Sequence, residues 1–307
     1  MKLLRLCAGT QKCQILLFGL GLIGSAIDRS LCLRFHGKGE IRPYDWQDAD
    51  LRCVQRGAIR EALESDGGGG RIILVWAGGR SGFGSTVEDM EGETLLVNEL
   101  VTFACRIKER FRDSAVEFHL LSSAGGLFEG QTHCSASSRP RPMRPYGEGK
   151  MAQERILFRA RELDGRHIYR PSSVYGVTGS RRVGLVAALI GNGLTGATTH
   201  IFGNPGTLRD YVLADDVGRF VAGRIAIAEH GPVRVHLLAT GRPAAVHEII
   251  ELTRRCTDAP LRLRFDPHPT NTRNMSFLTS ALPVGWTSTS LATGVAHAAI
   301  LIRSQLR

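Results

Sequence analysis

The sequence predicts an α/β protein: a doubly wound parallel sheet followed by a smaller, interrupted C-terminal domain. Short apolar runs alternate with helical patterns, and one of these, ETLLVNELVTFACRIKERF, is apolar at helical intervals. Strands separated by helices indicate βαβ units and a parallel sheet covered on both faces. The apolar runs expected to form strands lie at 13–19, 71–79, 115–126, 166–176 and 233–240.

A change of pattern after about residue 176 sets the expected domain boundaries. Beyond it the strand pattern loosens. We therefore expect a first domain of residues 1–176 plus about 210–245, and a smaller domain of about 177–209 plus 246–307. A cleft between two such domains is a common place for a ligand, so the smaller domain is expected to bind the substrate.

The charge and hydropathy of the chain limit the classes of partner that the protein is expected to bind. The chain has 39 Lys and Arg against 29 Asp and Glu, and its net charge of +10 suits an anionic partner such as nucleic acid or a phosphorylated small molecule. The arginines are dispersed and form no basic patch interleaved with aromatic residues, which disfavours nucleic acid. The apolar stretch ILLFGLGLIG is too short to cross a bilayer, so no membrane association is expected.

Cysteine usage bears on location and metal binding. The 7 cysteines are odd in number and scattered, with no Cys-x-x-Cys pair. They indicate neither a disulfide framework nor a zinc site, and no metal is expected. A reducing, cytoplasmic environment fits this pattern.

A glycine-rich turn follows the first predicted strand. LLFGLGLIGSA places Gly19, Gly21 and Gly24 after the strand and at the opening of a helix, which is the context that a Gly-x-Gly-x-x-Gly motif requires. The glycines permit a tight turn and let the backbone approach a pyrophosphate, which the helix N-terminus stabilises. The turn therefore predicts a dinucleotide site.

An acid about twenty residues further on bears on the choice of dinucleotide. EIRPYDW is expected to be a second strand that ends in Asp45. A carboxylate there can bind the two ribose hydroxyls and would repel a 2'-phosphate, which favours NAD over NADP. Arg42 keeps NADP as the minor alternative, and a glycine-rich hairpin with a solvated Asp45 is the alternative without a cofactor.

A tyrosine and a lysine four positions apart form the candidate catalytic pair. Tyr146 and Lys150 stand at the start of an amphipathic helical pattern, so both side chains face the same way. The ammonium can favour the ionised phenol, and a tyrosine tuned in this way can act as a base. The spacing alone also occurs by chance, but Ser122 and Ser123 end a predicted strand about two dozen residues earlier.

Strand-end serine, Tyr-x-x-x-Lys and an N-terminal dinucleotide turn together resemble the extended short-chain dehydrogenase/reductase family, in its NAD-dependent nucleotide-sugar epimerase/dehydratase branch. Further similar segments are IYRPSSVYG, GTLRDYVLADDVGRFV and TGRPAAVHEIIELTRRCTDAPLRLRF. The likeness runs over almost the full length and implies a Rossmann fold, NAD as cofactor, a nucleotide-diphosphate sugar as substrate and a homodimer.

The resemblance also implies roles for single residues. Tyr146 would be the acid/base that takes a proton from a sugar hydroxyl while hydride leaves for the nicotinamide. Lys150 would hold the nicotinamide ribose, and Ser123, with Ser122 as the alternative, would bind the reacting hydroxyl. Further contacts implied are Ala77 and Pro171 for the cofactor, and Ser173, Arg209 and Arg273 for the substrate.

The residues after the strand-end serines narrow the reaction. Branch members that eliminate water carry an Asp-Glu pair there, whereas this chain has Ala124, Gly125 and Gly126. The substitution disfavours a dehydratase, and small residues leave room for a 4-keto sugar to turn over, as a 4-epimerase requires. A reductase or dehydrogenase of the same family, or a non-catalytic dinucleotide-binding sensor, stays open.

Two departures from the family pattern concern the cofactor. The segment at 46–71 is shorter than usual and lacks the Gly-Asp that borders the adenine, and the glycine turn is one residue tighter. His133 and Cys134 invite comparison with the acid/base pair of members that epimerise beside a ketone. Their loop is rich in Ser and Pro, which favours ordinary loop residues.

Overall fold

A seven-stranded sheet forms the centre of the protein, in the strand order β11-β6-β5-β4-β2-β1-β3. The computed structural model describes residues 1–8, 11–37, 39–65, 70–177, 183–258, 260–266 and 272–306. Parts of the predicted smaller domain, at 178–182, 259, 267–271 and 307, lie outside the described residues. Five strands run parallel: β2 (Gln11–Phe18), β4 (Gly70–Trp76), β5 (Ser114–Leu121), β6 (Gly165–Pro171) and β11 (Arg234–Leu238).

These five strands coincide with the five predicted runs, and the predicted α/β class is confirmed. Their side chains alternate between two apolar clusters, because successive residues of a strand point to opposite faces. Leu16 and Leu74 belong to the cluster on one face, and Ile15 and Ile73 to the cluster on the other. Both faces are therefore buried, as the continuous apolar runs required.

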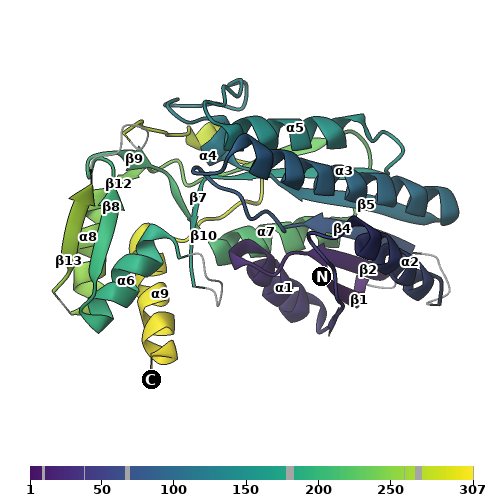
Figure 1. Ribbon diagram of the computed structural model, residues 1–307, viewed down its shortest axis with the longest axis horizontal. Helices are drawn as coiled ribbons and strands as arrows, with labels where there is room; N and C mark the ends of the chain where they lie inside the picture. The colour runs from purple at the N-terminus through teal and green to yellow at the C-terminus, as the bar shows by residue number, and fades with distance from the viewer. Residues whose placement is uncertain are drawn as a thin grey trace.

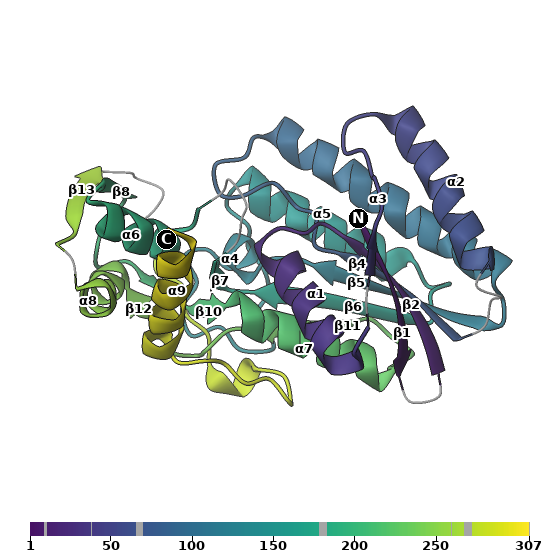
Figure 2. The same ribbon diagram turned by 90° about the horizontal axis from the view of Figure 1, so that it is seen from below.

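Helices cover both faces of the sheet (Figures 1 and 2). On one face lie α1 (Leu22–Phe35) and α7 (Ala214–Ile227). On the other lie α2 (Ala49–Ser65), α3 (Val87–Arg110) and α5 (Pro145–Arg159). The helix expected between the second and third predicted strands is α3, and it begins earlier than the apolar pattern indicated.

The N-terminal edge of the sheet differs from the prediction. An additional strand, β1 (Lys2–Ala8), pairs antiparallel with β2 on one side and with β3 (Gly39–Ile41) on the other. It occupies the place beside the nucleotide-binding strand that the order 3-2-1-4-5-6 gives to the next parallel strand. β3 is therefore one strand, about 4.8 Å, further out than a doubly wound sheet would place it.

The second predicted strand also ends earlier than expected. It stops at Ile41, so the prediction that it ends in Asp45 was wrong. Pro43 follows and has no N–H to donate to a sheet ladder. Before the proline, the Arg42 N–H donates to the Met1 carbonyl oxygen at 3.0 Å, beside the start of β1. After the proline, Tyr44 packs edge-on against Phe18.

A smaller region lies beyond one end of the sheet (Figure 1) and has its own apolar cluster. It contains α6 (Leu185–Thr195), α8 (Val246–Thr257), α9 (Leu291–Gln305) and the parallel pair β8 (Thr198–Phe202) and β13 (Arg262–Asp266). Two short ladders connect it to the sheet: β7 (Ser173–Tyr175) with β10 (Tyr211–Leu213), and β9 (Leu208–Arg209) with β12 (Ala244–Ala245). The remaining short helices are α4 (Ala124–Leu127) and η1 (Thr279–Ala281). The exact domain boundaries stay a prediction.

Candidate active site

A cleft of about 710 Å³ lies between the sheet and the smaller region. Its wall on the sheet side includes Ser123 at the start of α4, Tyr146 on α5 and Pro171 at the end of β6. The smaller region contributes side chains of β8 and β9, among them Arg209. Predicted catalytic and substrate residues from distant parts of the chain therefore line one cavity.

Tyr146 and Lys150 lie together on the first turns of α5, as their spacing predicted. Pro145 occupies the first position of the helix, where its missing N–H costs no helical hydrogen bond. The Lys150 Nζ lies 5.8 Å from the centroid of the Tyr146 ring. Tyr146 lines the cleft, whereas Lys150 is buried behind it with 4% of its surface exposed.

A buried carboxylate that the sequence analysis did not single out holds this lysine. The Lys150 Nζ donates to Glu93 Oε1 at 2.7 Å and to Gln153 Oε1 at 3.1 Å. Burial alone would lower the pKa of Lys150, but the charge of Glu93 and the phenol of Tyr146 raise it above its usual value. Burial would likewise raise the pKa of Glu93, but Lys150 and the hydrogen bonds around it lower it to about 2. Both groups are charged at neutral pH.

A signal for Glu93 was present in the sequence. On α3 the buried positions Met90, Val97 and Leu100 recur at helical spacing, and Glu93 falls on the same stripe. A charged residue on the apolar face of a helix needs a buried partner. The sequence alone did not say which of its many cations that partner is.

The two strand-end serines have different partners. Ser122 also lines the cleft, but its hydroxyl donates to Glu154 Oε1 at 2.6 Å. Glu154 is also bonded twice by Arg170, at 2.9 and 2.6 Å. Ser123 begins α4, and its Oγ accepts the N–H of Gly126 at 3.1 Å. A hydroxyl that accepts a hydrogen bond still has its own O–H to donate, so this geometry favours Ser123 over Ser122 as the substrate contact.

The small residues after Ser123 do not form the open floor that was expected. Ala124 is fully buried in an apolar cluster, and a Cβ added at Gly126 would stand 2.8 Å from the Tyr146 ring. Only Gly125 of the three is among the described residues that line the cleft. Two of the small residues are therefore explained by packing against α5 and the core.

Phe83 closes the cleft beside Tyr146. The two rings meet edge to face with centroids 5.8 Å apart. The Arg144 guanidinium lies over the other side of Phe83, 4.9 Å from its centroid, and donates two hydrogen bonds to the buried Glu129 at 2.8 and 2.5 Å. The loop after β4 is thereby fixed against the start of α5.

The glycine turn has the geometry of a dinucleotide cradle. Gly19 has a φ of +97°, and a Cβ there would lie 2.4 Å from the Gly78 Cα. A Cβ at Gly24 would lie 2.0 Å from the Gly19 carbonyl oxygen, so α1 packs directly on the turn. Gly21, by contrast, has nothing within 4 Å, and no side chain of the described residues caps α1 there. The first turn of α1 thus has room and free N–H groups for a diphosphate.

The cofactor residues near this turn lie in two places. The Ala77 N–H donates to the Phe18 carbonyl oxygen at 2.8 Å, which fixes the end of β4 beside the turn. Asp45 lies in the loop after β3, where its Oδ1 accepts the N–H groups of Asp48 and Gln47 at 2.7 Å each. These two hydrogen bonds lower the pKa of Asp45, so the group is an anion at neutral pH.

The edge expected to border the adenine is built from aromatic rings. Trp46 stands between Tyr44 and Trp76, with ring centroids 5.3 and 5.8 Å away. A Cβ at Gly78 would lie 3.0 Å from the Trp46 ring. The loop that carries Asp45 is in this way brought back to the end of β4, although β3 itself lies further out.

The predicted substrate residues differ in placement. Ser173 and Arg209 line the cleft, and Arg209 donates to the carbonyl oxygens of Leu208, at 3.2 Å, and of Arg273. Burial lowers the pKa of Arg209, but an arginine remains charged at neutral pH. The Arg273 side chain is exposed, bonds to the Met143 sulfur, and is not among the described residues of the cleft wall.

His133 and Cys134 are loop residues. The His133 side chain is exposed, and the His133 backbone N–H donates to Ser276 Oγ at 2.8 Å. Cys134 is buried in a bridge with Phe277, and burial raises the pKa of its thiol. Neither is among the described residues that line the cleft.

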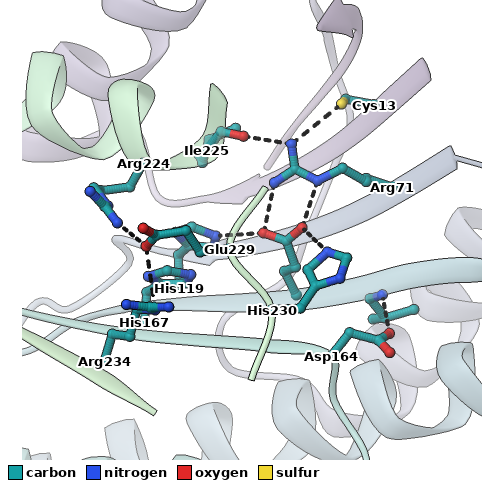
Figure 3. A network of polar contacts seen from close by, with 12 residues as sticks. Cys13, Arg71, His119, Asp164, His167, Arg224, Ile225, Glu229, His230 and Arg234 are labelled. Atoms are coloured by element: carbon teal, nitrogen blue, oxygen red, sulfur yellow. Dashed lines mark hydrogen bonds and ion pairs between the residues drawn. The ribbon is translucent and has the colours of Figure 1, made fainter. Parts of the chain in front are cut away.

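A second polar cluster lies inside the sheet, away from the cleft (Figure 3). Among the described residues, Glu117, His119 and His167 could offer one ligand atom each, all within 4.8 Å of one another. Arg71, however, bonds both Glu117 oxygens, at 2.6 and 2.8 Å. Because a divalent ion would lie beside this guanidinium, the cluster does not favour metal binding, and the absence of a metal stays a prediction.

Comparison with known proteins identifies the family. Residues 40–234 match the family described as NAD dependent epimerase/dehydratase. The chain belongs to this family. The matched range begins after the glycine turn and includes Tyr146, Lys150 and Arg209.

Individual relatives agree with the family. The UDP-glucose 4-epimerase of Mycolicibacterium smegmatis is 36% identical over 120 residues, which span 36% of this chain and 38% of that enzyme. Of solved structures, MoeE5 in complex with UDP-glucose and NAD has a TM-score of 0.76 at 22% identity, covering 95% of this chain and 99% of that one. The Thermus thermophilus UDP-glucose 4-epimerase in complex with NAD has a TM-score of 0.73 at 18% identity, covering 94% and 98%.

Family membership confirms the predicted branch, the Rossmann class of the fold and NAD as the cofactor. The residues of the cleft fit NAD, because the glycine cradle is open at Gly21 and Lys150 stands behind Tyr146. Within the part of the chain that the structure describes, no helix is both long enough and apolar enough to cross a membrane.

Proposed function

We propose that this family member epimerises a nucleotide-diphosphate sugar through a transient 4-keto intermediate. The observation that carries the proposal is the meeting of Ser123 and Tyr146 on one wall of the cleft, with Lys150 directly behind the phenol. This set supports proton removal at one sugar hydroxyl. It contains no second acid and base for elimination at the Ala124–Gly126 turn.

In the proposed reaction, Tyr146 accepts the proton of the C4 hydroxyl and later returns it. Ser123 donates a hydrogen bond to the same oxygen and holds it in place. NAD, when bound, supplies the hydride acceptor and then the hydride donor. Lys150 holds the ribose of the cofactor with the hydrogen that Glu93 and Gln153 do not engage, since an ammonium has three donors. The cleft would have to let the ketone turn over, so that the hydride chemistry of the cofactor would act on the opposite face of C4.

The far end of the cleft is proposed to bind the diphosphate. Arg209 supplies a partly buried positive charge there, and a guanidinium binds phosphate oxygens in fork geometry. Ser173 adds a hydroxyl on the sheet side. Arg273 contributes to this site by fixing Arg209 through its carbonyl oxygen. A cytoplasmic homodimer remains part of the proposal.

The test is turnover of a panel of nucleotide sugars that begins with UDP-glucose and UDP-glucuronic acid, with the products separated by chromatography. We expect interconversion of C4 epimers, no net accumulation of reduced nicotinamide, and retention in the product of deuterium placed at C4. The matched control is Tyr146→Phe, which keeps the ring. Stoichiometric NADH would identify a dehydrogenase instead. Loss of the label to solvent would indicate proton abstraction beside a ketone.

A further inference from the structure

Glu93 is bonded to the catalytic lysine and to the loop that closes the cleft. Its Oε1 takes the Lys150 ammonium at 2.7 Å and the Gln153 amide N–H at 3.1 Å. Its Oε2 takes the backbone N–H groups of Arg80 and Ser81, at 3.1 Å each. Both carboxylate oxygens are used, and the residue Glu93 has 7% of its surface exposed.

The glycine at position 79 leaves space for the ion pair of Glu93 and Lys150. A Cβ at Gly79 would lie 3.0 Å from Glu93 Oε1 and 3.2 Å from the Lys150 Nζ, so a larger residue would press on both ends of the ion pair. Ser81, Gly82 and Phe83 of the same loop line the cleft, and Phe83 packs against Tyr146. Glu93 therefore bonds both to the lysine and to the loop of the cleft wall, and it is not among the described residues that line the cleft.

We propose that Glu93 is a positioning residue that fixes the Lys150 ammonium and offsets part of its positive charge at Tyr146. A carboxylate bonded to the ammonium opposes the field that the ammonium exerts on the phenol. In this chain the positive field that the Tyr146 phenol experiences then depends on Lys150 and Glu93 together. The consequence for catalysis rests on the proposed function, but the electrostatic effect does not.

Four of the other charges around Tyr146 form two ion pairs. On α5, Glu154 is bonded by Arg170, and Arg144 is bonded by Glu129 from the end of α4. Arg80, in the loop after β4, meets Glu93 through its backbone N–H. Arg209 faces the cleft from the smaller region. Among the described residues, Glu93 is the carboxylate bonded to the Lys150 Nζ, so it is the position where a neutral substitution changes that ammonium most directly.

The test is a tyrosinate titration followed by ultraviolet absorbance in the NAD-loaded protein without substrate. Each variant is measured against the same variant carrying Tyr146→Phe, so that the difference reports Tyr146. Glu93→Gln should move the ionisation midpoint to lower pH by on the order of one unit, and the acidic limb of the pH profile of turnover should move with it. Gln153→Leu, which removes an uncharged partner of the same Nζ, should move it much less.

A charge swap keeps the proposal falsifiable even where Glu93→Gln is unstable. The double variant Glu93→Gln, Gln153→Glu keeps the net charge and moves the carboxylate to the other partner of Lys150, so the midpoint should return toward the wild-type value. An unchanged midpoint in folded Glu93→Gln overturns the proposal, as does a folded double variant whose midpoint stays shifted. The titration needs no substrate, so a failure to find epimerase activity would not affect its outcome.

Discussion

Two buried carboxylates of this protein have nearly the same local chemistry and different surroundings. Glu93 and Glu117 each accept a hydrogen bond from a cationic side chain, at 2.7 and 2.6 Å, and in each case burial is outweighed by the partners, so that the pKa is about 2. Arg71, the cation of Glu117, is enclosed and donates its remaining contacts to the Ile225 carbonyl oxygen and Cys13. Lys150, the cation of Glu93, faces Tyr146 and the cleft.

The comparison teaches that a buried ion pair indicates little about function until its distance from a ligand-accessible cavity is known. Glu117 belongs to a ladder across the sheet that continues through His119, Tyr169, His167 and His236. Every one of these side chains is buried and none of them lines the cleft, so we expect the ladder to affect the stability of the sheet and not the reaction. Glu117 Oε1 also lies 3.6 Å from the exposed His230, whereas His119 meets the other oxygen, Oε2. The pair at Glu93 is one side chain away from a cavity and can affect a reacting group.

The largest expected effect separates the two tyrosines of these regions. Tyr146→Phe should lower turnover by roughly 10²- to 10⁴-fold, because it removes the proposed acid/base and leaves the ring packing intact. Tyr169→Phe, which removes the 2.8 Å contact to His119, should leave turnover unchanged and lower the free energy of unfolding by about 1 kcal/mol. Steady-state kinetics and urea unfolding of both variants check this, and equal turnover in the two would contradict it.

A second prediction concerns the enclosed ion pair. Arg71→Met should lower the free energy of unfolding by roughly 3–5 kcal/mol, because it leaves the fully buried Glu117 without its cation. Replacing both partners, as Arg71→Met with Glu117→Leu, should recover most of that loss. Denaturant unfolding measures both, and turnover per folded molecule should stay constant. A double variant no more stable than the single one would contradict the interpretation.

The third prediction is that the central sheet loses stability as the pH falls. Burial and neighbouring cationic groups lower the pKa of His236 to about 4 and of His167 to about 2, from 6.5, so the folded protein favours neutral rings. Their contribution to stability is complete above about pH 6.5 and is lost as the pH falls, because the unfolded chain then binds protons that the folded chain does not. Each of the two histidines can lower the free energy of unfolding by up to about 1.4 kcal/mol per pH unit between pH 6 and 4.

Urea unfolding at a series of pH values between 7 and 4 measures this slope. His167→Gln with His236→Gln should flatten it, whereas His133→Gln, at an exposed loop position, should not. The carboxylates Glu93 and Glu117 add their own loss only below about pH 4.5. A slope that the two buried substitutions leave unchanged would show that other groups set the acid limit.

The smallest effect distinguishes the neighbouring serines. Ser122→Ala should cost about 1 kcal/mol of stability, through the bond to Glu154, and leave turnover nearly unchanged. Ser123→Ala should instead lower turnover, because the Ser123 Oγ accepts the Gly126 N–H and keeps its own O–H to donate to the substrate. Parallel kinetics on the two variants decide between them. A larger loss of turnover in Ser122→Ala would reverse the assignment.

The sequence by itself determined what depends on near neighbours along the chain. Apolar runs predicted the parallel strands, Gly19 and Gly24 predicted a tight turn packed on a helix, and the four-residue spacing predicted that Tyr146 and Lys150 share a helix face. Each of these features is set by backbone conformation or helical geometry within a few residues. They could be predicted without knowledge of the rest of the fold, and the structure confirms them.

Tertiary structure decided what depends on partners far apart in sequence. Three features join segments from different parts of the chain: the placement of β1 between β2 and β3, the pairing of Lys150 with Glu93, and the bond of Ser122 to Glu154. A strand or a charged side chain carries no local mark of which partner it will take, because many candidates have the same chemistry. The choice is made by the packing that removes water from one pair and not from the others, which is also why only one of the two buried carboxylates lies beside the cleft.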